Sequence, residues 1–125
     1  MISPQHLTID LKECTHLDYL TKPKSVKWYI ERVCMNLELT RIGEPVIEQF
    51  HHPEDKDKCG ITATQVLGES LLSIHTYPEH KCAYIDIFSC SKFNTKIAIE
   101  FTRRVFGAKD FQVSLVKRMN LGDLV

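Results

Sequence analysis

The sequence predicts an α+β fold in which an antiparallel sheet carries helices on one of its faces. Three observations lead to this prediction. Two segments repeat apolar residues at helical steps, several short segments alternate like strands, and three of these strand-like segments follow one another directly. Consecutive short strands pair antiparallel, and helices then cover one face of the sheet. The 125 residues are expected to form one domain, 1–125.

The first half of the chain reads as strand, helix, strand. Residues 6–11 alternate, which places Leu7, Ile9 and Leu11 on one strand face. Pro23 opens a helix-like stretch over 24–39, whose apolar residues recur at three- and four-residue steps: Val26, Tyr29, Ile30, Val33 and Leu37. A second strand is expected at 46–50. The polar segment 51–60, with its proline and charges, is the clearest loop.

The second half predicts a run of strands, a helix and a last strand. The strand-like runs are 61–67, 71–77 and 82–90, and the last two are joined by a turn-forming sequence at 78–81 that suits a hairpin. Residues 96–106 are helical in spacing, and Gly107 is a fitting helix stop. A final strand is expected at 111–116.

Composition and charge exclude several classes of function. Sixteen Lys and Arg balance sixteen Asp and Glu, so no net charge favours nucleic acid or an anionic membrane. No apolar run approaches the roughly 20 residues of a spanning helix, and no signal peptide is visible. An odd number of cysteines without a close pair argues against disulfides and zinc. We expect a cytoplasmic protein without a metal, with free thiols at Cys14, Cys34, Cys59, Cys82 and Cys90.

Two segments carry residues capable of chemistry. Ser70 lies at the start of a strand, and two positions before it Gly68 permits a sharp bend. His75 shares the polar face of that strand. If 71–77 and 82–90 form a hairpin, their far ends meet and place Cys90, a thiol able to exchange a proton, near Ser70. From pattern alone, a half-buried strand with a polar solvent face and a packed cysteine is the better explanation of these residues.

A longer motif separates these alternatives. The run ESLLSIHTYPE over 69–79, followed by AYIDIFSC over 83–90, closely resembles the small prokaryotic S-adenosylmethionine decarboxylases. Their proenzymes carry a Glu-Ser-His-hydrophobic-Ser/Thr-Ile-His-Thr/Ser-aromatic-Pro-Glu motif, and then a strand that ends in Thr/Ser-Cys. The family's spacing from Ser to His to Cys is kept here at Ser70, His75 and Cys90. QHLTIDL at 5–11 and Phe50-His51 extend the resemblance over most of the chain.

The resemblance implies that the chain cuts itself between Glu69 and Ser70. This would give a β chain, 1–69, and an α chain, 70–125, whose first residue has become a pyruvoyl group. That group would form a Schiff base with the substrate and draw in electrons as carbon dioxide leaves. The expected product is decarboxylated S-adenosylmethionine, which supplies aminopropyl groups for spermidine synthesis.

The resemblance also assigns roles to other residues. His75 is implied as a base in self-cleavage and Thr62 as its helper, where the family usually has Ser. Cys90 is the implied proton donor to the substrate. Glu79, Asp10 and Tyr77 match substrate-binding positions in character. Family and size together predict a homodimer, paired either sheet to sheet or edge to edge.

Some positions depart from the family pattern and leave other functions open. Leu71, Gly68 and Ser91 replace His, Ser and Gly. Gln65 enters a strand that is usually apolar, and Pro53 stands where an aromatic usually stacks on adenine. A pyruvoyl-dependent decarboxylase of ornithine or arginine therefore remains an alternative. A non-catalytic regulatory paralogue is a third, although the intact motif argues against it.

Overall fold

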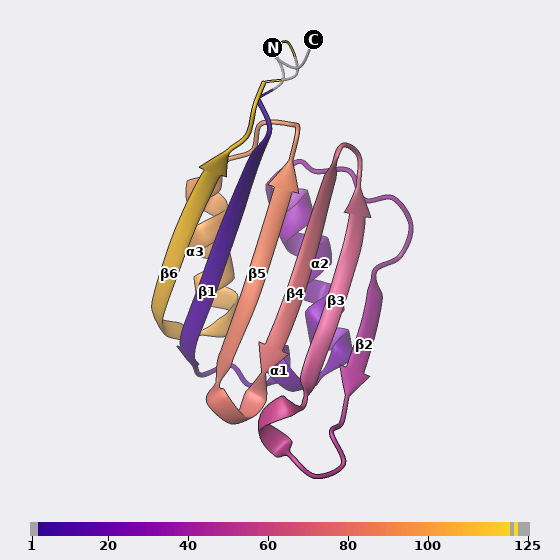
Figure 1. Ribbon diagram of the computed structural model, residues 1–125, viewed down its shortest axis with the longest axis vertical. Coiled ribbons are helices and arrows are strands. Elements are labelled where there is room, and N and C mark those ends of the chain that lie inside the picture. The colour runs from indigo at the N-terminus through magenta and orange to yellow at the C-terminus, as the bar shows by residue number, and fades with distance from the viewer. Residues whose placement is uncertain (1–2, 121, 123–125) are drawn as a thin grey trace.

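The computed structural model describes residues 3–120 and 122, and it shows a six-stranded antiparallel sheet with helices behind one face (Figure 1). The predicted α+β class is therefore confirmed. The strand order across the sheet is β2-β3-β4-β5-β1-β6. The strands are β1 (Gln5–Cys14), β2 (Val46–Phe50), β3 (Gly60–Leu67), β4 (Ser70–Tyr77), β5 (Cys82–Ser89) and β6 (Ala108–Lys117).

Three helices lie on one side of the sheet: α1 (Asp18–Thr21), α2 (Pro23–Asn36) and α3 (Thr95–Phe106). The short α1 was not predicted. Helix α2 ends three residues earlier than its apolar spacing predicts, because Glu38 takes a left-handed φ of 57°. Leu37 and Leu39 remain buried after the turn, so they extended the apolar pattern without extending the helix. No helix in the described residues is long and apolar enough to cross a membrane.

The core lies between the helices and the sheet. Every second residue of the central strands points to the helices and is buried, as the alternation in the sequence predicts. The helices contribute buried side chains at their inner faces, and the hydroxyl of Tyr29 on α2 bonds the Thr102 hydroxyl on α3 at 2.6 Å. Residues that fill the core include Leu7, Ile9, Leu11, Ile30, Val33, Leu72, Ile74, Ile85, Ile87 and Phe106.

In the described part of the chain no helix covers the other side of the sheet, which we call the uncovered face (Figure 1). In β3, β4 and β5 it is formed by the alternate residues Thr62, Thr64, Val66, Leu71, Ser73, His75, Tyr77, Tyr84, Asp86 and Phe88. Several of these are large and apolar yet exposed, and the same holds for Val116 of β6. An apolar sheet face of this kind is usually covered by another layer.

The hairpin of β4 and β5 fixes the geometry of the site. Its turn contains a 3-10 turn, η2 (Pro78–His80), and Lys81 in the left-handed region. From this turn the register runs from Tyr77 opposite Cys82 to Ser70 opposite Ser89. The predicted hairpin is confirmed, and it brings Cys90 directly beyond the end of the pair at which Ser70 lies.

Candidate functional site

The expected cleavage point lies in a tight turn between β3 and β4. Gly68 and Glu69 form this turn, and Leu67 pairs with Ser70 across it. Glu69 has a φ of 62°, a left-handed conformation that costs a residue with a side chain about 1–3 kcal/mol. Breaking the peptide bond after Glu69 would release that strain. The strained residue Glu69 thus precedes the peptide bond at which the family resemblance predicts cleavage.

A backbone hydrogen bond polarises the carbonyl of Glu69. The N–H of Cys90 donates to this carbonyl oxygen at 3.0 Å. A donor aimed at a carbonyl oxygen stabilises the negative charge that develops there when a nucleophile attacks the carbon. The arrangement suits an attack by the neighbouring Ser70 hydroxyl on Glu69.

Serine hydroxyls surround the same turn. The Oγ of Ser70 lies 2.6 Å from the Oγ of Ser89 and 3.3 Å from the carbonyl oxygen of Gly68. The Ser91 hydroxyl donates to the Glu69 carboxylate at 3.0 Å. We call these residues the Ser70 cluster: Gly68, Glu69, Ser70, Ser89, Cys90 and Ser91.

Ser89 is the member that sequence reasoning missed. The signal was available, because the hairpin turn at 78–81 fixes the register and pairs Ser70 with Ser89. Its hydroxyl is completely buried.

The cysteines fall into two groups. Burial raises the pKa of Cys14 and of Cys34 to about 11, so both remain thiols at neutral pH and act as core residues. Burial also raises the pKa of Cys82. Cys90 is half-buried and lies within the Ser70 cluster. Cys90 therefore lies beside the turn that holds Glu69, whereas Cys14 and Cys34 lie in the core.

Thr62 and His75 form a second group, which we call the His75 pair. The two residues face each other across β3 and β4, and the Thr62 Oγ1 lies 3.2 Å from the His75 Nδ1. Both are exposed on the uncovered face. Ser70 lies five residues away along β4, roughly 16 Å at about 3.3 Å per residue, and points to the helix side. A single chain therefore does not bring His75 to Ser70.

A small hollow of about 170 Å³ adjoins the His75 pair. Phe50 at the end of β2 lines it and is 54% exposed, and Tyr77 lines its other part. The ring of His52 packs edge-on against Phe50, with centroids 6.0 Å apart. An exposed ring held beside a hydroxyl and an imidazole is available to stack on a planar ligand.

Two of the three predicted substrate-binding residues line a larger hollow of about 870 Å³ on the uncovered side. Asp10 and Tyr77 both contribute to it, and the ring of Tyr77 packs edge-on against Tyr84. The nearby thiol of Cys82 is the main cause that raises the pKa of Tyr84. Glu79 lies in the adjoining η2 turn and is exposed. Three further carboxylates line this hollow, Glu13, Asp57 and Asp110, together with the basic side chains of Lys12 and His80.

The loop 51–60 is ordered by its own side chains. The His52 Nδ1 accepts hydrogen bonds from the backbone N–H groups of Glu54 and Asp55, at 3.2 and 3.0 Å. The Cys59 sulfur accepts one from the His52 N–H at 3.2 Å. His52 therefore serves the loop itself, and in the described residues no group of three or more His, Cys, Asp or Glu side chains could hold a metal ion.

Gln65 does not lie where substrate choice could be made, contrary to the sequence interpretation. It faces the helix side and is completely buried. Its amide donates to the carbonyl oxygen of Gly43 at 3.1 Å, and its Oε1 lies 3.5 Å from Arg41. A buried amide needs such partners, and these partners fasten the connection that leads to β2.

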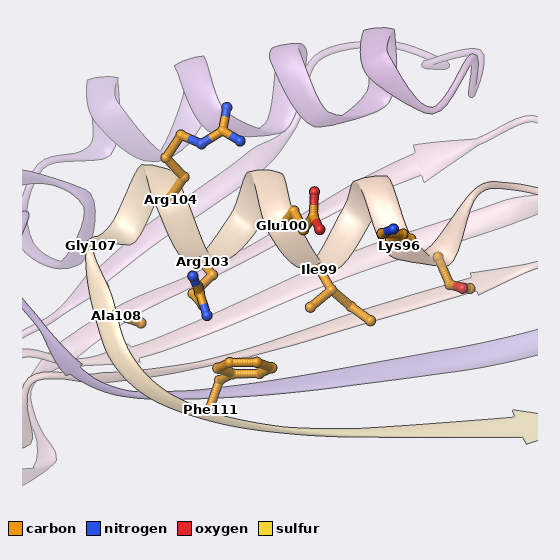
Figure 2. Close-up of a pocket in the computed structure, with 9 residues that line it drawn as sticks. Lys96, Ile99, Glu100, Arg103, Arg104, Gly107, Ala108 and Phe111 are labelled. Carbon is orange, nitrogen blue, oxygen red and sulfur yellow. The ribbon is translucent and has the colours of Figure 1, made fainter.

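A separate hollow of about 710 Å³ lies between α3 and β6, and none of the predicted site residues lines it (Figure 2). In it the guanidinium of Arg103 lies over the ring of Phe111, 5.2 Å from its centroid. Phe111 is exposed because α3 only partly covers the edge strand β6. This hollow holds none of the residues expected to act in cleavage or decarboxylation.

Comparison with known proteins shows a similarity to one family over most of the chain. Residues 5–119 match the model of the S-adenosylmethionine decarboxylase family. The S-adenosylmethionine decarboxylase proenzyme of Symbiobacterium thermophilum is 31% identical over 106 residues, 84% of this chain and 74% of that protein. The proenzyme of Thermodesulfovibrio yellowstonii is 31% identical over 114 residues, 90% of this chain and 78% of that protein.

A solved structure has the same fold. The crystal structure of the adenosylmethionine decarboxylase from Aquifex aeolicus superposes with a TM-score of 0.77 at 23% identity, and the match covers 94% of this chain and 91% of that one. Sequence and fold thus agree over nearly the whole chain. The chain belongs to the S-adenosylmethionine decarboxylase family.

Proposed function

We propose that this chain is a self-cleaving proenzyme that becomes a pyruvoyl-dependent S-adenosylmethionine decarboxylase. The observation that carries the proposal is the Ser70 cluster. A left-handed Glu69, a backbone donor on its carbonyl oxygen and the hydroxyl of the next residue all meet at one peptide bond. Membership of the family supports the same reading.

Self-cleavage would begin with an attack of the Ser70 Oγ on the carbonyl carbon of Glu69. A C–O bond forms, the C–N bond of the peptide breaks, and the proton lost by the hydroxyl is balanced by one gained on the nitrogen of Ser70. The N–H of Cys90 holds the charge on the Glu69 oxygen during this step. Loss of the Ser70 α-proton then expels the Glu69 carboxylate and leaves dehydroalanine at residue 70. Its imine tautomer would be hydrolysed by water to the ketone, with release of ammonia.

The residues present fit the pyruvoyl group that this sequence of steps would leave. Residue 70 is a serine, the precursor that the chemistry needs, and it opens the α chain, 70–125. When formed, the group would bind the substrate amine and accept the electrons released with carbon dioxide. Cys90 would return a proton to the substrate, and the bond from its backbone N–H to Glu69, the residue before Ser70, supports this role.

His75 and Thr62 would act on Ser70 of a second copy. Within one chain His75 and Ser70 are roughly 16 Å apart on opposite faces of β4, at about 3.3 Å per residue. Two uncovered faces packed on each other, related by a two-fold axis across the strands, would bring the His75 pair of each copy toward the Ser70 end of the other. The exposed apolar residues of this face supply the contact: Val66, Leu71, Tyr84 and Val116. A sheet-to-sheet homodimer thus completes the site.

Phe50 is the proposed platform for the adenine of the substrate. The residue at the position where the family tends to have this aromatic is Pro53, which cannot stack in that way. Phe50 is 54% exposed and lines the hollow beside the His75 pair. Stacking on an aromatic ring is worth about 1–3 kcal/mol per base. Phe50 would therefore restore the binding energy that the proline removes.

One observation favours a second substrate. The hollow lined by Asp10 is acidic, and a distal amine or guanidinium needs such carboxylates. A decarboxylase of ornithine or arginine would use the same Ser70 chemistry and ignore Phe50. The exposed ring beside the His75 pair makes S-adenosylmethionine the first choice.

A carbon dioxide release assay separates the two substrates. Purified protein is incubated with carboxyl-labelled S-adenosylmethionine, ornithine or arginine, with Ser70→Ala as the inactive control. Release from S-adenosylmethionine alone is expected. Release from ornithine or arginine, with none from S-adenosylmethionine, would overturn the proposed substrate and leave the chemistry of Ser70 intact.

A further inference from the structure

We propose that Ser89 aims the hydroxyl of Ser70 at the scissile carbonyl and acts in self-cleavage only. The inference rests on the proposed self-cleavage and goes beyond it, because it assigns a role to a buried hydroxyl that decarboxylation does not need. Ser89 is completely buried at the end of β5, and its Oγ lies 2.6 Å from the Ser70 Oγ.

The hydrogen bonds of Ser89 determine which of the two hydroxyls is the donor. The Ser89 Oγ accepts from the N–H of Ser91 at 2.9 Å, and its own proton goes to the carbonyl oxygen of Ser91 at 2.7 Å. A hydroxyl has one proton and two lone pairs. The one remaining lone pair of Ser89 can only accept, so Ser70 must donate to it.

This assignment leaves the nucleophile free to react. Ser70 has a second possible acceptor in the carbonyl oxygen of Gly68, but at 3.3 Å this bond is longer and weaker than the one at 2.6 Å. With its proton on the Ser89 side, both lone pairs of the Ser70 Oγ remain unused. The short bond also fixes the side-chain rotamer of Ser70 beside Glu69, and the attack needs this placement because a misplacement of 1 Å can cost roughly 10²-fold in rate.

The same bonds explain why the role ends at cleavage. The Oγ of Ser70 passes to the Glu69 carboxylate when the ester is eliminated, so the atom that Ser89 holds no longer belongs to residue 70. Ser91 connects the hydrogen bonds of Ser89 to the scissile residue, because the Ser91 hydroxyl donates to the Glu69 carboxylate at 3.0 Å. Ser89 is thus a positioning residue for one step of one reaction.

The test compares two rates in one variant. Wild type, Ser89→Ala, Ser89→Thr and a control, Ser25→Ala on α2 behind the sheet, are made by cell-free translation and sampled over time by mass spectrometry. Ser89→Ala is expected to cleave roughly 10²-fold more slowly. Ser89→Thr, which keeps the hydroxyl, and Ser25→Ala are expected to cleave like wild type. Once cleaved, Ser89→Ala is expected to release carbon dioxide at the wild-type rate per pyruvoyl group.

Hydroxylamine identifies the step that is slowed, because it cleaves esters and leaves peptide bonds intact. Ser89→Ala is expected to resist it, since the ester does not form. Rapid hydroxylamine cleavage of the variant, wild-type self-cleavage, or an equal loss of cleavage and turnover in a folded variant would each overturn the inference. If Ser89→Ala does not fold, Ser89→Cys serves, because a thiol is a weak acceptor. Wild-type cleavage in folded Ser89→Cys would also overturn it. A wild-type chain that never cleaves would instead defeat the proposed function.

Discussion

The Ser70 cluster and the His75 pair are built in different ways, although both lie on β4. The Ser70 cluster is closed within one chain: its hydroxyls bond one another, its carbonyl has a backbone donor, and Ser89 is buried. The His75 pair consists of two exposed side chains that bond only each other among the contacts described. The Ser70 cluster can hold its geometry within one chain, whereas we propose that the His75 pair is half of a site that a second copy completes. The Ser70 that is cleaved and the His75 that catalyses the cleavage can therefore belong to different copies of the chain.

Co-expression of two inactive variants is expected to give the largest effect, and it tests whether His75 acts on Ser70 of another copy. His75→Ala is expected to stop processing, because the base that removes the Ser70 α-proton is lost. Co-expression with Ser70→Ala, which keeps His75, is expected to restore cleavage in part of the His75→Ala chains. The measurement is intact mass of the two chains, distinguished by tags.

Two results would contradict the proposal that His75 of one copy acts on Ser70 of another. Normal cleavage of His75→Ala alone would remove His75 from processing. A failure of the mixed copies to cleave, when size-exclusion chromatography shows that they associate, would place both groups in the same chain's site.

Removing the thiol of Cys90 separates the two activities of the Ser70 cluster. Cys90→Ala keeps the backbone N–H that bonds Glu69, so the chain is expected to cleave. Its turnover is expected to fall by about 10²–10⁴-fold, the range for a lost acid or base. Cleavage is followed by mass and turnover by carbon dioxide release, with Cys59→Ala as the matched control. Turnover at the wild-type rate would show that another group delivers the proton.

Phe50→Ala tests whether this ring, which lines the hollow beside the His75 pair, binds the adenine of the substrate. Loss of a stacking platform is expected to raise the KM for S-adenosylmethionine by about 5–150-fold, equivalent to about 1–3 kcal/mol. Self-cleavage is expected to stay normal, because Phe50 lies beside the hollow and away from Glu69. Trp28→Ala, an exposed aromatic side chain on α2 behind the sheet, is the control. An unchanged KM in Phe50→Ala would leave the adenine without this platform.

The smallest expected effect concerns the thiols of Cys14 and Cys34, whose pKa is raised by burial in the core. Burial raises the pKa of Cys34 from 9.0 to about 11, so the folded state holds its proton more tightly than the unfolded state. The stability that this thiol contributes is therefore complete below pH 9 and is lost as the pH rises from 9 to 11. The expected loss is of order 2 kcal/mol.

Unfolding by urea at a series of pH values measures this loss. Cys34→Ala is expected to flatten the fall of the free energy of unfolding between pH 9 and 11, whatever its effect at neutral pH. An equally steep fall in the variant would show that Cys34 does not carry the dependence. Cys90→Ala serves as the comparison.

The fold could be predicted from the sequence because its signals are local. Alternation marked the strands, and a proline and a glycine marked the start of α2 and the end of α3. The hairpin of β4 and β5 followed from its turn, and with it the closeness of Ser70 and Cys90. The short α1 had no such signal, since four residues are too few to show a period.

The site could be predicted only in part, because its remaining contacts join distant segments. Gln65 stood out as a polar residue in an apolar strand, yet its partners come from the connection before β2 and could not be seen in β3. The separation of His75 from Ser70 was implicit in their spacing, because an odd step along a strand reverses the face. The pairing of Ser70 with Ser89 was likewise implicit in the hairpin register.

The central claim is that the bond between Glu69 and Ser70 cuts itself, and intact-mass spectrometry of the purified chain tests it most directly. The wild type is expected to give two chains, 1–69 and 70–125, with the second bearing a ketone in place of its amino group. Ser70→Ala is expected to remain one chain of 125 residues. A wild-type chain that stays whole through prolonged incubation, or one that is cut at another bond, would contradict the account.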